Sequence, residues 1–157
     1  MHSFAHRPPF NNMSINYKTL AGALLNEQNS PFVINVIGHC MRPILESGDQ
    51  VEVLPSAHYF PGDVVVFEHP QHGLTAHRML GLTLSTRGFR YMTKADSSSV
   101  IDRMLEPHKV LGRSDRNLSQ ARSIRPDTII RLSCIAQMMN ISMLLAFKKL
   151  LAFKKLH

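Results

Sequence analysis

The sequence predicts a mainly β protein: a small, irregular, antiparallel, barrel-like sheet with one helix before it and one after it. Three observations lead to this fold class. Short apolar runs, several of them β-branched or alternating, follow one another between residues 31 and 115. Glycines and prolines separate these runs, and helical spacing of apolar residues occurs only outside them. Short strands with such breaks are typical of small antiparallel sheets.

The individual strands are predicted from their side-chain patterns. Residues 32–37 are β-branched and of strand length, and residues 50–54 alternate between apolar and polar side chains. Residues 63–67 form a continuous apolar run, which favours a central strand with both faces buried. Further strands are expected at residues 74–82, 89–93 and 109–111.

The chain of 157 residues is long enough for one domain with a buried core, and its pattern divides it into three regions. Residues 1–30 are predicted to be an N-terminal tail with a short helix over residues 14–25. Residues 31–115 are predicted to form the β domain. Residues 116–157 are predicted to be a polar linker and an amphipathic helix, which Asp127 would cap.

The composition favours a cytoplasmic protein and contact with an anionic partner, with a soluble basic protein as the alternative. The chain has 18 Lys and Arg against 11 Asp and Glu, a formal net charge of +7. This charge favours acidic lipid, nucleic acid or an acidic peptide, but does not select among them. Cys40 and Cys134 lie far apart and are better explained as two reduced thiols than as a disulfide framework. The first ten residues lack the apolar segment of a secretory signal, so we expect a cytoplasmic location.

Residues 38–49 carry the most informative pattern. Gly38 follows the first predicted strand and lets the backbone turn without a Cβ penalty. Cys40 comes just after this turn, where its side chain can be presented at the end of a strand. Met41 can pack beneath it, and Gly48-Asp49 is typical of a turn before the next strand.

This stretch resembles a sequence box of the signal peptidase I and LexA-type peptidases: a small residue, a nucleophilic Ser, Met, any residue, Pro, and then Gly-Asp. Cys40 holds the position of the Ser. Further blocks are similar in order and spacing. Residues 62–67 resemble the second Gly-Asp strand, residues 75–79 the block with the general base, residues 91–96 the Thr-Lys-Gly-Asp block, and residues 110–113 the strand that closes the domain.

The resemblance implies a Cys-His-Asp triad. His77 stands at the general-base position, where most members have Lys and the branch similar to the endoplasmic-reticulum signal peptidase subunit has His. Asp102 follows Asp96 by the six residues that separate the triad acid from the block aspartate, so the resemblance makes Asp102 the triad acid. Asp96, with Gly38 and Met41, then has a supporting role. The backbone N–H of the nucleophile would contribute to the oxyanion hole.

The function that this resemblance implies is that of a cysteine endopeptidase, cleaving a peptide or protein precursor. A Cys-His pair is chemically coherent, because the ion pair is a ready nucleophile near neutral pH. An alternative remains open from the residues themselves: Cys40 is a small buried residue, His77 is a packed histidine, and the fold is an inactive module that binds a peptide or protein partner.

Metal, cofactor and nucleic acid are not expected from the sequence. The histidines at positions 39, 58, 69 and 72 lack the spacing of a metal-binding motif, even with Cys40 included. The LexA-type repressors carry a helix-turn-helix before this domain. About 30 residues precede the predicted β domain here, which we expect to be too few for such a module and a linker.

The C-terminal residues repeat one hexapeptide, Leu-Leu-Ala-Phe-Lys-Lys, over residues 144–155. Paired lysines beside Leu and Phe suit a helix on an anionic membrane surface, so we expect peripheral contact with the inner membrane surface. A helix that packs on the domain or on another copy is the alternative, and so regular a duplication also leaves an artificial origin open. Residues 132–147 are too short and too polar for a predicted membrane span.

Overall fold

A computed structural model of the chain describes residues 30–69, 73–86, 88–102 and 104–154. The helix predicted over residues 14–25 lies outside the described residues. The elements are, in chain order, β1 (Phe32–Asn35), β2 (Gln50–Leu54), β3 (Val64–His69), β4 (Gly73–Ser85), β5 (Gly88–Lys94), the 3-10 turn η1 (Pro107–Lys109), β6 (Val110–Asn117), β7 (Arg122–Ser123) and the helix α2 (Thr128–Lys154).

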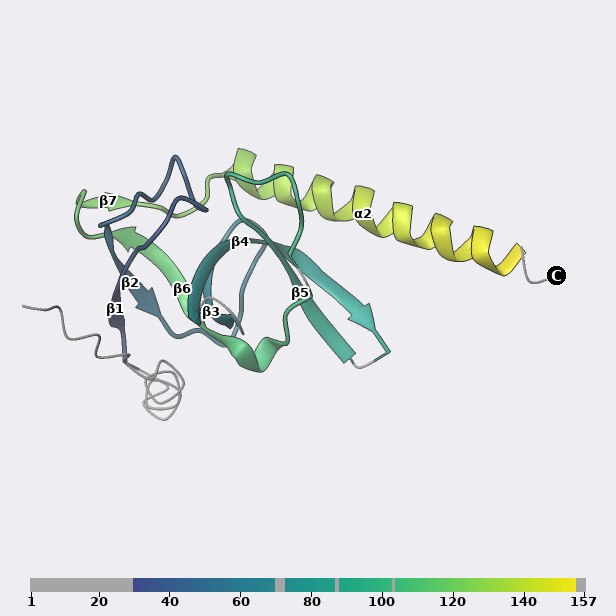
Figure 1. The fold of residues 1–157 in the computed structure, drawn as a ribbon, viewed down its shortest axis with the longest axis horizontal. Helices are drawn as coiled ribbons and strands as arrows, with labels where there is room; N and C mark the ends of the chain where they lie inside the picture. Colours follow the sequence, from purple (N-terminus) through teal and green to yellow (C-terminus); the bar gives the residue numbers. More distant parts are fainter. Residues whose placement is uncertain (1–29, 70–72, 87, 103, 155–157) are drawn as a thin grey trace, which may run out of the picture.

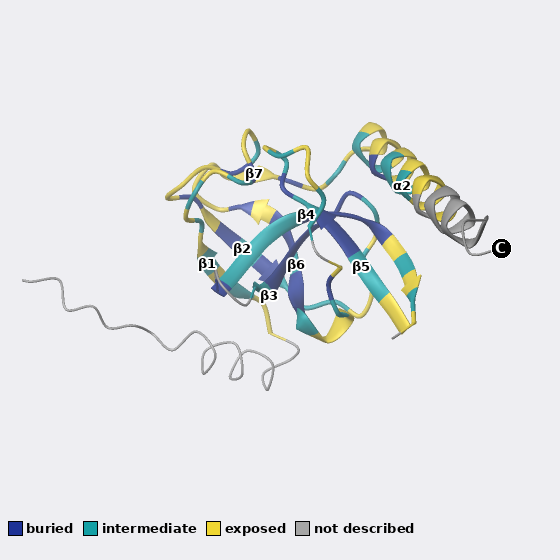
Figure 2. Ribbon diagram, turned by 45° about the vertical axis from the view of Figure 1, so that its right-hand side comes forward, coloured by how far each residue is buried: buried dark blue, intermediate teal, exposed yellow. Residues whose placement is uncertain are grey.

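The strands form one antiparallel sheet in the order β1-β2-β6-β3-β4-β5, with β7 paired to β6 (Figure 1). The mainly β class predicted from the sequence is therefore confirmed. β3 lies between β4 and β6, and its residues Val64, Val65 and Val66 are fully buried. This central position explains its continuous apolar run, because both of its faces are covered (Figure 2).

The predicted barrel-like closure is wrong, because the sheet is open. β1 and β5 stand at opposite ends of the strand order and do not pair with each other. The outer edge of β5 is occupied instead by the segment that follows it, through bridges from Tyr91 to Leu105 and from Lys94 to Ile101. These bridges satisfy backbone groups that barrel closure would otherwise have to satisfy.

The end of β6 extends into the stretch expected to be a linker. β6 continues to Asn117, and β7 follows at residues 122–123. Two buried polar residues at this end of β6, Asp115 and Asn117, have partners. The Asn117 amide donates to Asp49 Oδ2 at 2.7 Å, and Arg125 Nε donates to Asp115 Oδ2 at 3.0 Å. A polar sequence therefore forms an interior strand here, since its hydrogen bonds are made within the protein.

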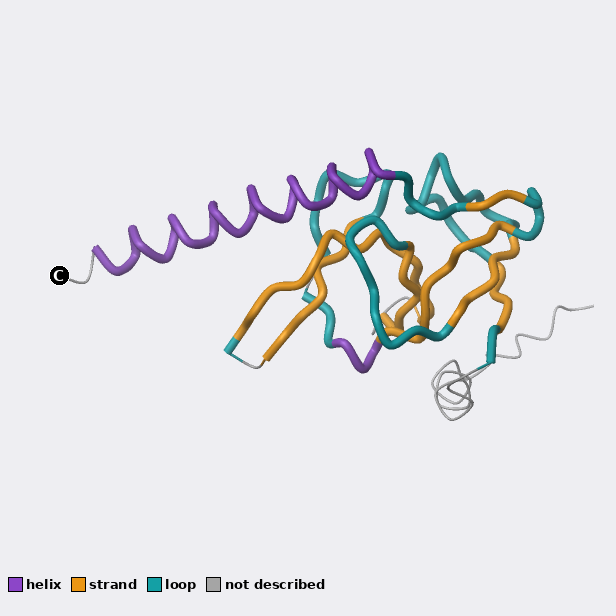
Figure 3. The backbone as a smooth tube through the Cα atoms, turned by 180° about the vertical axis from the view of Figure 1, so that it is seen from behind, coloured by secondary structure: helices purple, strands orange, loops and turns teal. Residues whose placement is uncertain are grey.

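The helix α2 begins at Thr128, directly after the predicted cap Asp127, whose Oδ1 accepts the backbone N–H of Ile130 at 2.8 Å. Its first half packs on β4, where Cys134 joins Leu80 and Met92 in a buried cluster. The rest of the helix runs on beyond the end of the sheet, as seen from both sides (Figures 1 and 3). Among the described residues, no helix combines the length and the apolar character that a bilayer span requires.

We expect Gly112→Ala to lower the free energy of unfolding by about 1–3 kcal/mol, the usual effect of overpacking. A Cβ at this position on β6 would lie 2.7 Å from both Leu54 O and Val53 Cγ1 of β2. Urea unfolding measures the change. The control is Ala121→Gly, because Ala121 has a φ of 49° in the left-handed region and glycine relieves that strain. An unchanged free energy of unfolding in Gly112→Ala would contradict the close approach of β2 and β6.

Candidate active site

Cys40 lies in the turn that follows β1 and is held close to β4. Gly38 adopts a φ of 92°, which glycine reaches without strain, and reverses the chain. Met41 is buried in the core cluster that includes Leu45, and Cys40 packs against this cluster. The Cys40 thiol donates to the carbonyl oxygen of Ala76 at 3.8 Å. The turn thus places the thiol beside the residue that precedes His77.

His77 and Asp102 form a short hydrogen bond across the site. The Nδ1 atom of His77 lies 2.6 Å from Asp102 Oδ2. Thr93 Oγ1 donates to the same carboxylate oxygen at 2.8 Å, and the Asp102 backbone N–H donates to the Thr93 carbonyl at 2.9 Å. The carboxylate is therefore oriented by both its backbone and its side chain. Thr93 was not among the predicted site residues, although it opens the Thr-Lys block quoted for the resemblance.

The surroundings of His77 favour its protonated form. Burial by itself lowers the pKa of His77, but hydrogen bonds with the Asp102 and Cys40 side chains and their negative charges raise it to about 9. Since Asp102 engages Nδ1, Nε2 is the ring nitrogen left for the thiol. The ring also packs edge-on against Phe67, with centroids 5.8 Å apart. At neutral pH His77 is therefore an imidazolium, paired with the Asp102 carboxylate.

Asp96 has a different partner. Its two carboxylate oxygens accept hydrogen bonds from Arg78 Nε at 2.7 Å and from Arg78 Nη2 at 2.6 Å. The third nitrogen of that guanidinium donates to the Gly62 carbonyl at 2.7 Å. The two candidate acids thus have different partners: Asp102 is hydrogen-bonded to His77, and Asp96 is hydrogen-bonded to the neighbouring Arg78. The sequence offered no signal for the arginine partner, because the pairing joins β4 to the turn that follows β5.

Ser97 is a further residue at the site that the sequence analysis did not single out. Its backbone N–H and its hydroxyl both donate to the Cys40 carbonyl, each at 3.0 Å. The segment that follows β5 is therefore hydrogen-bonded to the backbone of Cys40. Among the described residues, the Cys40 backbone N–H has no hydrogen-bond acceptor.

The Gly48-Asp49 turn after the Cys40 segment is held from three directions. Asp49 Oδ2 accepts the backbone N–H of Glu46 at 2.9 Å and the amide of Asn117, and Gln120 approaches the same carboxylate at 3.3 Å. The Glu46 N–H holds the pKa of Asp49 below its usual value, with smaller contributions from both amides. This carboxylate therefore ties the nucleophile turn to the end of β6.

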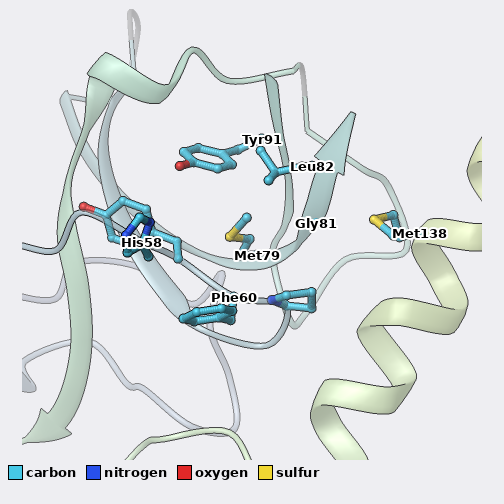
Figure 4. Close-up of a pocket in the computed structure, with 9 residues that line it drawn as sticks. His58, Phe60, Met79, Gly81, Leu82, Tyr91 and Met138 are labelled. Carbon is cyan, nitrogen blue, oxygen red and sulfur yellow. The ribbon is translucent and has the colours of Figure 1, made fainter. Parts of the chain in front are cut away.

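A cavity of about 350 Å³ lies to one side of these residues, between β4, β5, α2 and the segment of residues 58–61 (Figure 4). The described residues that line it include Tyr59, Met79, Tyr91 and Met138, and none of them is Cys40, His77 or Asp102. Met138 reaches it from α2 over Gly81, where a Cβ would collide with the Met138 sulfur. Within the described part of the chain, no three His, Cys, Asp or Glu side chains gather as metal ligands would.

In comparisons with known proteins, no family model matches the chain, and no curated protein is detectably similar to it in sequence.

We expect the stability of the protein to fall as the pH rises from about 6.5 to about 9. The pKa of His77 is raised in the folded state from 6.5 to about 9, so its protonation stabilises the fold fully below pH 6.5. That stabilisation, on the order of 3 kcal/mol, is lost as the pH passes the folded pKa. Urea unfolding at several pH values measures the loss, and an NMR titration of His77 locates its pKa.

The control for this pH dependence is Asp102→Asn, which removes the negative partner of the imidazolium. Its unfolding free energy should change less over the same pH interval than that of the wild type. A His77 resonance that titrates near 6.5 in the wild type would contradict the arrangement.

Proposed function

We propose that this protein is a cysteine endopeptidase of the signal peptidase-like type, which cleaves a peptide or protein precursor through Cys40, His77 and Asp102. One observation carries the proposal. The Nδ1 atom of His77 lies 2.6 Å from Asp102 Oδ2, and the Cys40 thiol, which donates to the carbonyl oxygen of the adjacent Ala76, acts together with Asp102 to raise the pKa of His77. Nucleophile, base and orienting acid, in this order, form the constellation that acyl transfer requires.

In the acylation half of the proposed reaction, the Cys40 thiolate attacks the scissile carbonyl carbon and a C–S bond forms. The negative charge moves to the carbonyl oxygen, which the Cys40 backbone N–H can stabilise. The His77 imidazolium then gives its proton to the leaving nitrogen. The C–N bond breaks, the amine product departs, and the acyl group remains on Cys40 as a thioester.

In the deacylation half, His77 is neutral and takes a proton from water as the water oxygen attacks the thioester. The C–S bond breaks and the acid product leaves. Cys40 is then again a thiolate, and His77 is again an imidazolium. Asp102 keeps Nδ1 protonated throughout, so that Nε2 faces the reacting atoms. Thr93 assists as a positioning residue, because its hydroxyl holds the oxygen of Asp102 that His77 contacts.

The substrate would bind as an extended strand beside the nucleophile. β1 leads directly to the Cys40 turn and is an edge strand, paired only with β2 among the described strands. Its free edge can pair with the backbone of a peptide and present a carbonyl to Cys40. By the resemblance, small residues would flank the cleaved bond. Two unpaired thiols support a reducing, cytoplasmic setting.

We expect Cys40 to react with iodoacetamide at pH 7 about tenfold faster in the wild type than in His77→Ala, because only the thiolate attacks efficiently.

Cys40→Ala should abolish peptide cleavage with little change in the melting temperature. Cys40→Ser should keep some activity with a higher pH optimum, since a serine needs neutral His77 as its base. Mass spectrometry of the alkylated peptide and steady-state cleavage of a library-selected peptide measure these effects.

The matched control is Cys134→Ala, which removes the other thiol. Cys134 is buried, and burial raises the pKa of its thiol, so it should alkylate slowly and contribute nothing to turnover. Retained turnover in Cys40→Ala would exclude the covalent mechanism. Slow alkylation of wild-type Cys40, together with no cleavage, would favour the inactive peptide-binding module.

We expect Asp102→Asn and Asp96→Asn to have opposite effects. Asp102→Asn should lower turnover by about 10²–10⁴-fold with a modest change in stability, because His77 loses its orienting charge. Asp96→Asn should cost about 3 kcal/mol of stability, since it leaves the buried Arg78 guanidinium without its carboxylate. Cleavage rates and thermal melting of both variants test this. An inactive Asp96→Asn beside a normal Asp102→Asn would reverse the assignment.

A further inference from the structure

The helix α2 has a second apolar face that the sheet does not cover. Its exposed side chains alternate in steps of three and four residues, so they form one stripe along the helix. In the described part of α2 this stripe consists of Ile129, Leu132, Ala136, Met139, Met143 and Ala146. The large members are well exposed, from 60 % for Leu132 to 77 % for Ile129.

This outward stripe lies opposite the face that packs on the sheet. The packed face consists of Ile130, Cys134, Met138 and Ile141, which contact the cluster around Leu80 and Met92. At about 100° per residue, the two sets point in nearly opposite directions. Rotating the helix to bury the stripe would therefore expose the packed face. A single sheet cannot cover both.

The charges of the segment are all of one sign. No Asp, Glu, Lys, Arg or His side chain occurs from Leu132 to Phe147, and Asp127 is the last Asp or Glu in the sequence. The final turns of α2 then carry Lys148, Lys149 and Lys154. An exposed apolar stripe on a helix whose last turns carry lysines, with no acidic side chain after Asp127 to balance them, is complementary to a surface that is apolar inside and anionic at its boundary.

A second copy of the chain fits this surface less well. Two helices joined through the stripe would bring together cations without any acidic residue after Asp127 to neutralise them. The alanines at positions 136 and 146 would also leave a thin contact between two such helices. A lipid surface has neither restriction, because its headgroups supply the negative charge and its acyl chains adapt to the stripe.

We propose that α2 docks lengthwise on an anionic lipid surface, with the outward stripe turned toward the bilayer and the C-terminal lysines among the headgroups. The sheet then lies on the opposite side of the helix, away from the lipid. This docking does not depend on the peptidase activity, so the two proposals are tested separately.

Sedimentation with phosphatidylcholine vesicles, with and without about 30 % phosphatidylglycerol, tests the docking on the full chain. We expect binding to the anionic vesicles that weakens at high salt. Met139→Glu and Leu132→Glu should each weaken it by about tenfold, since a charge on the stripe must be buried or lifted from the interface. Replacement of Lys148, Lys149, Lys154 and Lys155 by Gln should weaken it by at least tenfold on anionic vesicles.

The matched control is Gln137→Glu, which adds the same charge to the same helix, turned away from the stripe. Its binding should stay within about twofold of the wild type. The substituted lysines come after the half of α2 that packs on the sheet, so their replacement by Gln should not affect folding. This variant therefore still tests the docking if a stripe variant fails to fold.

Two results would overturn the docking. One is equal binding of Met139→Glu, Leu132→Glu and Gln137→Glu to anionic vesicles. The other is a concentration-dependent dimer in sedimentation velocity that Met139→Glu abolishes, in a protein that binds no vesicles. That second result would assign the stripe to another copy of the chain.

Discussion

The buried ion pair between Arg78 and Asp96 holds the segment after β5 against β4, and the stability of the fold around the candidate site depends on it. The side chains are only 8 % and 15 % exposed, and the guanidinium also donates to the Gly62 carbonyl. Charges this far from water are tolerated only when they are fully paired. The segment that begins at Asp96 then supplies Ser97 to the Cys40 carbonyl and Asp102 to His77. The ion pair thus stabilises the segment, and the hydrogen bonds of Ser97 and Asp102 position the two contacts at the site.

β4 joins this structural pair to the proposed chemistry, because His77 and Arg78 are neighbours on one strand. Successive side chains of a strand point to opposite faces, so one residue reaches Asp102 and the next reaches Asp96. A slip of one residue would exchange them. Pairing on both sides prevents this slip, with His77 opposite Val65 of β3 and Arg78 opposite Lys94 of β5.

Gly62-Asp63 has a different structural role from Gly48-Asp49. Asp63 accepts the backbone N–H of Phe60 at 2.9 Å and an Arg131 nitrogen of α2 at 3.1 Å. Gly62 permits Pro126 to approach, since a Cβ there would lie 2.9 Å from the Pro126 Cβ. These contacts anchor only the start of α2. The helix is thus fixed to the sheet at one end and leaves its outward stripe accessible along its length.

The sequence by itself determined the features that have local causes. β-branched and alternating runs predicted the strands, the polar Asp127 predicted the start of α2, and the order of the motifs nominated Cys40, His77 and Asp102. Local patterns could not show that the sheet stays open, because closure depends on whether β1 meets β5. They also predicted a linker where buried hydrogen bonds turn polar residues into β6.

Only the tertiary structure decided which side chains meet. Cys40 and Ala76 are 36 positions apart, and His77 and Asp102 are 25 positions apart. The roles of Thr93, Ser97 and Arg78 depend on how the chain returns along the edge of β5. The division of α2 into a packed and an outward face likewise depends on where the helix lies on β4. A periodic pattern reports neighbours along one element, whereas these contacts join elements that are distant in sequence.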